Sequence, residues 1–139
     1  MTYSEFTFVA QTDRGHVSNV KLFDYLDQAR KDWYTFCVKA AGVEAVVVHI
    51  GVDYKQEVFQ GNKLFIKTWI ERIGNTSFTL KQTMVNELGE LVVSADVILT
   101  TINRQTREKT SVPSKIRALL TQDSILDLSL IVSQTKPCK

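Results

Sequence analysis

An acidic side chain and a predicted helix start stand close together near the beginning of the sequence. Asp13 lies in a polar stretch, and Asn19 opens an amphipathic pattern. The unpaired N–H groups of a helix start carry about half a positive charge and can stabilise a negative oxygen. A carboxylate can act as a general base or as a nucleophile. The pair therefore predicts attack on a carbonyl carbon, with Asp13 as base or nucleophile and the main-chain amide of Asn19 as oxyanion donor.

The histidines and cysteines offer weaker candidates for catalysis or metal binding. His16 lies between the two residues above and is a candidate catalytic residue, although its imidazole equally suits ordering the loop or the helix start. His49 stands in an apolar strand pattern and is interpreted as a structural histidine. Together with Cys37 and Cys138, these histidines form no cluster with ligand spacing, so no metal site is expected.

One long helix is predicted behind this loop. Apolar residues recur at steps of three and four over residues 19–41, which predicts a single helix there. Ser18 or Asn19 can cap its start, and Gly42 can take the left-handed conformation that ends it. Strands are predicted from β-branched and aromatic patterning at 5–10, 46–54, 63–73, 77–87 and 91–103.

The turns indicate how the strands pair. The links at Gly74-Asn75 and at residues 87–89 are too short for a parallel crossover, so an antiparallel sheet is expected, with the helix covering its apolar face. Residues 113–120 resemble a short final helix. Residues 125–132 alternate in a partly strand-like way, but they equally suit an amphipathic turn or a tail docked on a partner.

Composition limits the class of protein. With 139 residues, of which 44% are hydrophobic and 23% charged, we expect one domain over residues 1–139 with a tail from about residue 123. A formal net charge of +2 does not favour nucleic acid as a partner. No apolar run approaches the roughly 20 residues of a membrane span, and no secretory signal is visible, so a cytoplasmic location is expected.

Five stretches of sequence carry a resemblance to a known family. They read DRGHVSN at 13–19, LFDYLDQAR at 22–30, VDY at 52–54, GNKL at 61–64 and IGNTSF at 73–78. The first two resemble the D-x-x-G-H-V-N-N and E-x-A-R signature of the acyl-CoA thioesterases that are similar to 4-hydroxybenzoyl-CoA thioesterase. The resemblance extends over about residues 5–120 and implies an α+β hotdog fold, in which a five-stranded antiparallel sheet wraps around one long helix.

The resemblance also implies an activity and an assembly. The activity is hydrolysis of an acyl thioester to a free acid and coenzyme A, with Asp13 and the Asn19 amide at the reacting carbon. The carrier is coenzyme A or an acyl-carrier protein, and no cofactor is expected beyond the coenzyme A of the substrate. The expected assembly is a homodimer, joined sheet edge to sheet edge with active sites at the subunit boundary. Two such dimers are expected to pair further into a homotetramer.

The same resemblance places further residues near the substrate. Gly15, Val17, Ser18 and Ser77 are the candidate substrate-binding residues. Gly15 would permit close approach of the acyl group to the main chain. Ser77 is equally interpreted as a turn serine that bonds its own backbone.

Two alternatives to hydrolysis stay open. The family usually has two residues between its acid and its glycine, whereas Arg14 alone separates Asp13 from Gly15 here. A loop one residue shorter can shift a carboxylate by up to about 3.5 Å, which motivates a non-catalytic module that binds acyl-CoA or an acyl-carrier protein. The second alternative is an acyl-thioester hydratase or dehydratase, but the Pro- and Gly-rich loop of those enzymes is not evident.

Overall fold

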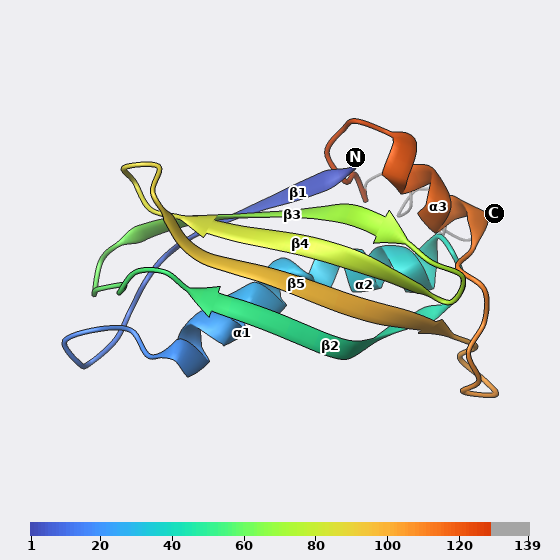
Figure 1. Cartoon of the computed structure of the whole chain (residues 1–139), viewed down its shortest axis with the longest axis horizontal. Helices are drawn as coiled ribbons and strands as arrows, with labels where there is room; N and C mark the ends of the chain where they lie inside the picture. Colours follow the sequence, from blue (N-terminus) through green and yellow to red (C-terminus); the bar gives the residue numbers. More distant parts are fainter. Residues whose placement is uncertain (129–139) are drawn as a thin grey trace, which may run out of the picture.

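A five-stranded antiparallel sheet forms one layer of the molecule, and two consecutive helices lie across it (Figure 1). The computed structural model describes residues 1–128. The elements are β1 (Tyr3–Val9), α1 (Asn19–Ala29), α2 (Lys31–Lys39), β2 (Glu44–Tyr54), β3 (Lys63–Ile73), β4 (Ser77–Val85), β5 (Leu91–Ile102) and α3 (Ser114–Thr121). The strand order is β1-β3-β4-β5-β2, and every neighbouring pair is antiparallel. The predicted sheet is therefore confirmed, with β1 and β2 at its edges.

The predicted long helix has an interruption at Arg30, which separates α1 from α2. The side-chain amide of Gln82 donates to the Leu26 carbonyl at 3.0 Å, and this carbonyl is the acceptor that the Arg30 N–H would use in a continuous helix. The Arg30 N–H bonds to the Asp27 carbonyl instead, at 3.0 Å. The helical segment therefore runs from residue 19 to 39 as two helices, and Gly42 follows it in the left-handed conformation with φ of 70°.

The Arg30 side chain lies buried between the helices and the sheet. Its guanidinium donates to Gln82 Oε1 at 2.9 Å, to the Tyr34 hydroxyl at 3.0 Å and to Asp27 Oδ1 at 3.2 Å. The Gln82 amide also donates to Thr68 Oγ1 at 3.0 Å. A buried charge is tolerated only with such compensation. The network therefore fixes the junction of the two helices over the middle of the sheet.

The apolar side of the sheet packs against the helices in two clusters. The cluster beneath α1 includes Leu22, Leu26, Ala29, Leu64, Ile66, Met84, Val93 and Ala95. The cluster beneath α2 and α3 includes Trp33, Cys37, Ile70, Phe78, Leu80, Val97, Leu99, Ile116 and Leu119. Trp33 belongs to the core as its helical spacing predicts, and its indole N–H donates to Ser4 Oγ at 2.8 Å. Each helix thus covers its own part of the sheet.

The residues after α3 return to the edge of β1. The Tyr3 N–H donates to the Ser124 carbonyl at 3.1 Å, and the Leu126 N–H donates to the Tyr3 carbonyl at 2.6 Å. Ile125 therefore forms a parallel bridge with Tyr3, which agrees with the partly strand-like pattern of this segment. The rest of the expected tail, from residue 129 onward and including Cys138, lies outside the described residues. Within residues 1–128, no helix has both the length and the apolar character that crossing a membrane requires.

Replacing Gln82 by Leu should lower the free energy of unfolding by about 2–4 kcal/mol, because the Arg30 guanidinium and the Leu26 carbonyl lose a buried partner. Urea unfolding followed by circular dichroism measures the change. Gln28→Leu is the matched control, since the Gln28 amide bonds to Asp24 on the exposed surface, and its effect should stay within about 0.5 kcal/mol. Equal losses in the two variants would contradict a stabilising role for the buried network.

Candidate active site

The loop between β1 and α1 is held at both ends by the segment that follows β2. At its beginning, the Ala10 N–H donates to the Asn62 carbonyl and the Gly61 N–H donates to the Ala10 carbonyl, both at 2.8 Å. At its end, the Val17 N–H donates to the Val58 carbonyl at 2.7 Å. Both valine side chains are buried, so apolar contact accompanies this hydrogen bond. The start of α1 is thereby fixed beside the end of β2.

Ser18 is the N-cap of α1, as the sequence allows. Its hydroxyl accepts the Lys21 N–H at 3.2 Å, and its carbonyl accepts the Leu22 N–H at 3.1 Å. Among the residues that the structure describes, none accepts a hydrogen bond from the N–H of Asn19 or Val20. First-turn N–H groups point out of the helix start, at the positive end of its dipole. These two groups are therefore available to a negatively charged oxygen.

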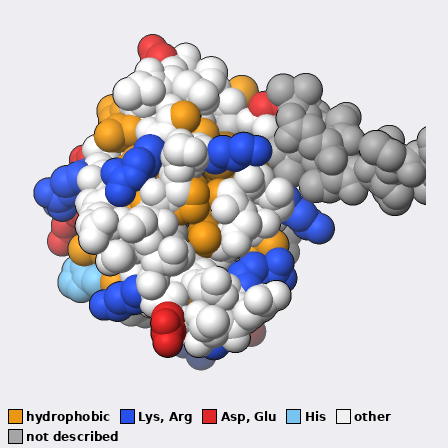
Figure 2. Space-filling model, turned by 90° about the vertical axis from the view of Figure 1, so that its right-hand side faces the viewer, with side chains coloured by type: hydrophobic (Ala, Val, Ile, Leu, Met, Phe, Trp, Pro, Cys, Tyr) orange, Lys and Arg blue, Asp and Glu red, His pale blue; other side chains and the backbone are white. Residues whose placement is uncertain are grey.

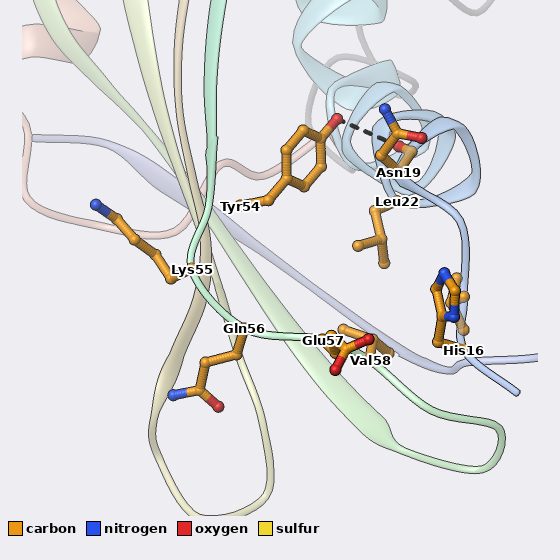
Figure 3. Close-up of a pocket in the computed structure, with 9 residues that line it drawn as sticks. His16, Asn19, Leu22, Tyr54, Lys55, Gln56, Glu57 and Val58 are labelled. Carbon is orange, nitrogen blue, oxygen red and sulfur yellow. Dashed lines mark hydrogen bonds between the residues drawn. The ribbon is translucent and has the colours of Figure 1, made fainter.

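A cleft of about 360 Å³ opens at this helix start (Figure 3). Its lining comprises His16, Val17, Asn19, Leu22, Tyr54, Lys55, Gln56, Glu57 and Val58. The lining comes from the loop, from the first turn of α1 and from the end of β2 with the residues that follow it. In Figure 3 the ring of Tyr54 is directed at the start of α1, whereas Lys55 and Gln56 point away from His16. The part of the cleft nearest the helix start is thus walled by Tyr54, Leu22 and the loop.

Tyr54 connects the sheet edge to the helix. Its hydroxyl donates to the main-chain carbonyl of Asn19 at 3.2 Å. Desolvation raises the pKa of the Tyr54 hydroxyl above its ordinary value. A tyrosine hydroxyl is protonated at neutral pH even at its ordinary pKa of about 10, and an upward shift does not change that, so the Tyr54 hydroxyl is available as a hydrogen-bond donor.

Three of the expected site residues, His16, Val17 and Asn19, line the cleft together. Ser18 does not line it, and its hydroxyl is engaged as the helix cap. His16 is exposed and lies in the cleft close to the loop end of α1. The structure therefore groups the predicted oxyanion donor with the candidate histidine.

Asp13 and Gly15 lie in the exposed part of the loop and outside the cleft lining. Thr12 organises this part, because the Arg14 N–H donates to Thr12 Oγ1 at 3.1 Å and this oxygen donates to the His16 carbonyl at 3.4 Å. No hydrogen bond or ion pair joins the Asp13 side chain to another residue in the described part of the chain. The structure does not bring the Asp13 carboxylate into the cleft with Asn19.

Ser77 lies at the other end of the sheet from the cleft. It is the first residue of β4 and pairs with Thr100, which in turn pairs with Val46 near the start of β2. The cleft is at the end of β2, and an 11-residue strand extends roughly 30 Å. Figure 2 views the end of the molecule where α3 lies, which is the Ser77 end, and shows Lys and Arg side chains spread around it. Within one chain, Ser77 is therefore remote from His16 and Asn19.

The cleft also contains residues that the sequence did not single out as functional. Tyr54, Lys55, Gln56 and Glu57 line it because the segment after β2 bonds to the loop before α1. Glu57 brings a carboxylate into the lining. Tyr54 belongs to the VDY stretch of the resemblance, but no local pattern marks these four positions as part of a cleft, since their placement depends on a pairing between distant parts of the chain.

The other potentially reactive side chains, Cys37 and His49, are in positions that do not suit a catalytic role. Burial raises the pKa of the Cys37 thiol to about 12, so the thiolate that a nucleophile requires does not form near neutral pH. His49 is exposed on β2, away from the residues that line the cleft. Over residues 1–128, no group of three or more His, Cys, Asp or Glu side chains is positioned to hold a metal ion. The cleft at the start of α1 is the candidate active site.

Comparison with solved structures shows which known fold the protein has. A DHNA-CoA thioesterase from Staphylococcus aureus is 23% identical, with 91% of this chain and 100% of that chain covered and a TM-score of 0.69. A variant 4-hydroxybenzoyl-CoA thioesterase, solved with 4-hydroxybenzoyl-CoA, is 19% identical, with coverage of 86% and 99% and a TM-score of 0.72. A hypothetical protein from Staphylococcus aureus, solved with CoA, is 12% identical, with coverage of 99% and 96% and a TM-score of 0.75. The expected hotdog fold is confirmed.

Comparison of the sequence with protein families gives the relationship. No curated protein matches the chain. Residues 9–120 match the thioesterase-like superfamily. This range contains β2 to β5, the two helices that cover the sheet and every residue of the cleft lining, whereas only the last residue of β1, Val9, falls inside it. The protein therefore belongs to the thioesterase-like superfamily.

Proposed function

We propose that the protein hydrolyses acyl-CoA thioesters at the start of α1. The observation that carries the proposal is the pair of unengaged N–H groups of Asn19 and Val20 beside a cleft, in a member of the thioesterase-like superfamily. A thioester carbonyl develops negative charge on its oxygen when its carbon is attacked. A preorganised N–H donor for that charge lowers the barrier by roughly 3 kcal/mol.

In the proposed reaction, water adds to the thioester carbon. The Asp13 carboxylate takes the proton of the water as the new C–O bond forms, and the carbonyl oxygen becomes an oxyanion bonded to the Asn19 N–H. The intermediate collapses with cleavage of the C–S bond, which releases coenzyme A as a thiolate and the acyl group as the free acid, and the proton on Asp13 passes to the thiolate or to water. In a second version the Asp13 carboxylate attacks the thioester carbon and displaces coenzyme A as the thiolate, and water then hydrolyses the mixed anhydride to the free acid and the regenerated carboxylate.

Asp13 must turn toward the cleft for either version. The Asp13 side chain lies outside the cleft lining, but Asp13 is only three residues before His16 in the sequence, and His16 is part of the lining. Hydrogen bonds within the loop, at Thr12 and His16, hold this part of it, and the Thr12 N–H also donates to Gln60 Oε1 in the segment after β2. A change of conformation confined to residues 13–16 would leave the anchoring bonds at Ala10, Thr12 and Val17 intact.

The proposed assembly is a homodimer in which two copies join along β2. This strand is a sheet edge and exposes Val46 and Val48, with relative accessibilities of 36% and 58%. Unpaired edge strands are a liability that a second copy removes. Antiparallel pairing of β2 with its copy brings the Tyr54 end of one chain beside the Glu44 end of the other. A pairing of two such dimers gives the expected homotetramer.

This pairing also gives Ser77 a place near the substrate. The Ser77 end of one copy then lies next to the cleft of the other, together with the loop that carries Arg104 and Arg107. Both arginines are exposed, and Arg107 forms an ion pair with Glu44 at 2.8 Å. The cationic side chains at this end suit the phosphates of coenzyme A. A protein carrier of the acyl group is the other carrier that the sequence left open.

A binding module without turnover is the second candidate function. The observation that favours it is the position of Asp13 outside the cleft lining, together with the single residue between Asp13 and Gly15. Such a module would bind acyl-CoA in the same cleft and release no thiol.

Asp13→Asn should lower kcat by about 10²- to 10⁴-fold, because the variant keeps the size of the side chain but loses the base. Release of free thiol from a panel of straight-chain, branched and aromatic acyl-CoAs measures the rate. Glu57→Gln is the comparison variant, since it removes the carboxylate that already lines the cleft, and its kcat should fall far less than that of Asp13→Asn because the proposal assigns Glu57 no proton transfer. Unchanged turnover in Asp13→Asn, with loss of turnover in Glu57→Gln, would transfer the role of base to Glu57.

Binding of acyl-CoA without thiol release by the unsubstituted protein would favour the binding module.

Replacing both Val46 and Val48 by Lys should convert the dimer to a monomer, because four charges would meet along the paired edges. Light scattering coupled to size-exclusion chromatography measures the mass. Leu88→Lys is the control, since Leu88 is 82% exposed in the turn between β4 and β5. A dimer that survives the double substitution would show that the copies join elsewhere.

A further inference from the structure

Tyr54 is the last residue of β2, and its hydroxyl bonds to the helix start across the cleft. The hydroxyl donates to the Asn19 carbonyl at 3.2 Å, while the ring forms part of the cleft wall (Figure 3). Among residues 1–128, the main-chain hydrogen bond at this junction is the one from the Val17 N–H to the Val58 carbonyl. Tyr54 is therefore the side chain that ties the sheet edge to the first turn of α1.

The carbonyl that Tyr54 binds belongs to the Asn19–Val20 peptide. The N–H of this peptide is that of Val20, and it is one of the two N–H groups left without an acceptor in the described chain. A hydrogen bond received at the oxygen of a peptide polarises the N–H on its other side, because chains of hydrogen bonds strengthen one another. The Tyr54 hydroxyl therefore orients the Val20 N–H and also makes it a stronger donor.

The end turns of a helix, the first turn included, fray more readily than its middle. Oxyanion stabilisation depends on donors whose direction is set before the charge develops, since reorienting them during the reaction would add to the barrier. The capped N–H of Lys21 and the helical N–H of Leu22 are already engaged. The Tyr54 bond thus acts directly on the Val20 N–H, which belongs to the same peptide, and on the Asn19 N–H through the backbone of Asn19.

We propose that Tyr54 is a positioning residue that holds the Asn19–Val20 peptide so that the N–H groups of Asn19 and Val20 face the reacting carbonyl oxygen. This inference rests on the proposed hydrolysis, because the direction of these donors affects a rate only if they bind the oxyanion. The role is distinct from substrate contact, since the hydroxyl is committed to a main-chain acceptor. It predicts an effect on turnover that exceeds any effect on binding.

Tyr54→Phe tests the role because it retains the ring in the cleft wall and removes the hydroxyl. We expect kcat to fall by about tenfold, which corresponds to the loss of one hydrogen bond of ordinary strength, and KM to change by less than about twofold. Amide hydrogen exchange at residues 21 and 22, whose N–H groups are hydrogen-bonded to Ser18 in the first turn, should become faster when measured without substrate. Tyr3→Phe is the matched control, because Tyr3 lies against Lys67 on a different part of the sheet, and it should alter neither the rate nor the exchange.

The outcomes separate the positioning role from the proposed reaction. Unchanged exchange in Tyr54→Phe would overturn the restraint on the helix start. Faster exchange with an unchanged kcat would overturn the positioning role while hydrolysis stands. A raised KM with an unchanged kcat would also overturn it, because Tyr54 would then contact the substrate. If the unsubstituted protein hydrolysed no acyl-CoA of the panel, the proposed function would fail and the positioning role with it.

Discussion

The hydrogen bond between the Val17 N–H and the Val58 carbonyl is the contact on which the site depends. It joins the residue before the N-cap of α1 to the segment that leaves the edge of the sheet, and both valine side chains are buried around it. A bond between such buried groups is costly to leave unmade. Because it forms, the positive end of α1 opens on a cleft rather than on free solvent.

The rest of the fold keeps α1 in that orientation. The buried Arg30 takes its acceptors from both helices and from β4, so the end of α1 is fixed over the middle of the sheet while its start is fixed at the sheet edge. Leu22 and Leu26 bury one face of the helix between these two points. The first turn is thus held by packing as well as by main-chain bonds, which is what a preorganised oxyanion site requires.

The sequence predicts the parts of this arrangement that are local. Strand alternation and short turns place all five strands within two residues of their bounds, and the Ser18 cap follows from the preference of serine for that position. The interruption at Arg30 is not predictable in this way, because it depends on the amide of Gln82, which lies 56 residues from the carbonyl that it binds.

The site shows the same division between local and distant interactions. Asn19 and His16 are recognisable because they flank a helix start, and both line the cleft. Tyr54 and Glu57 reach the cleft only through the pairing of two segments that are far apart in sequence. The orientation of Asp13 depends on how Thr12 folds the loop onto itself, and the spacing of residues does not encode that conformation.

The most direct test of the account is a crystal structure of the protein with an acyl-CoA analogue in which a methylene group replaces the thioester sulfur. The account predicts that the carbonyl oxygen of the analogue lies about 3 Å from the main-chain nitrogen of Asn19, within hydrogen-bond distance. An analogue bound with its carbonyl away from the start of α1 would contradict the central claim that this helix start binds the reacting oxygen.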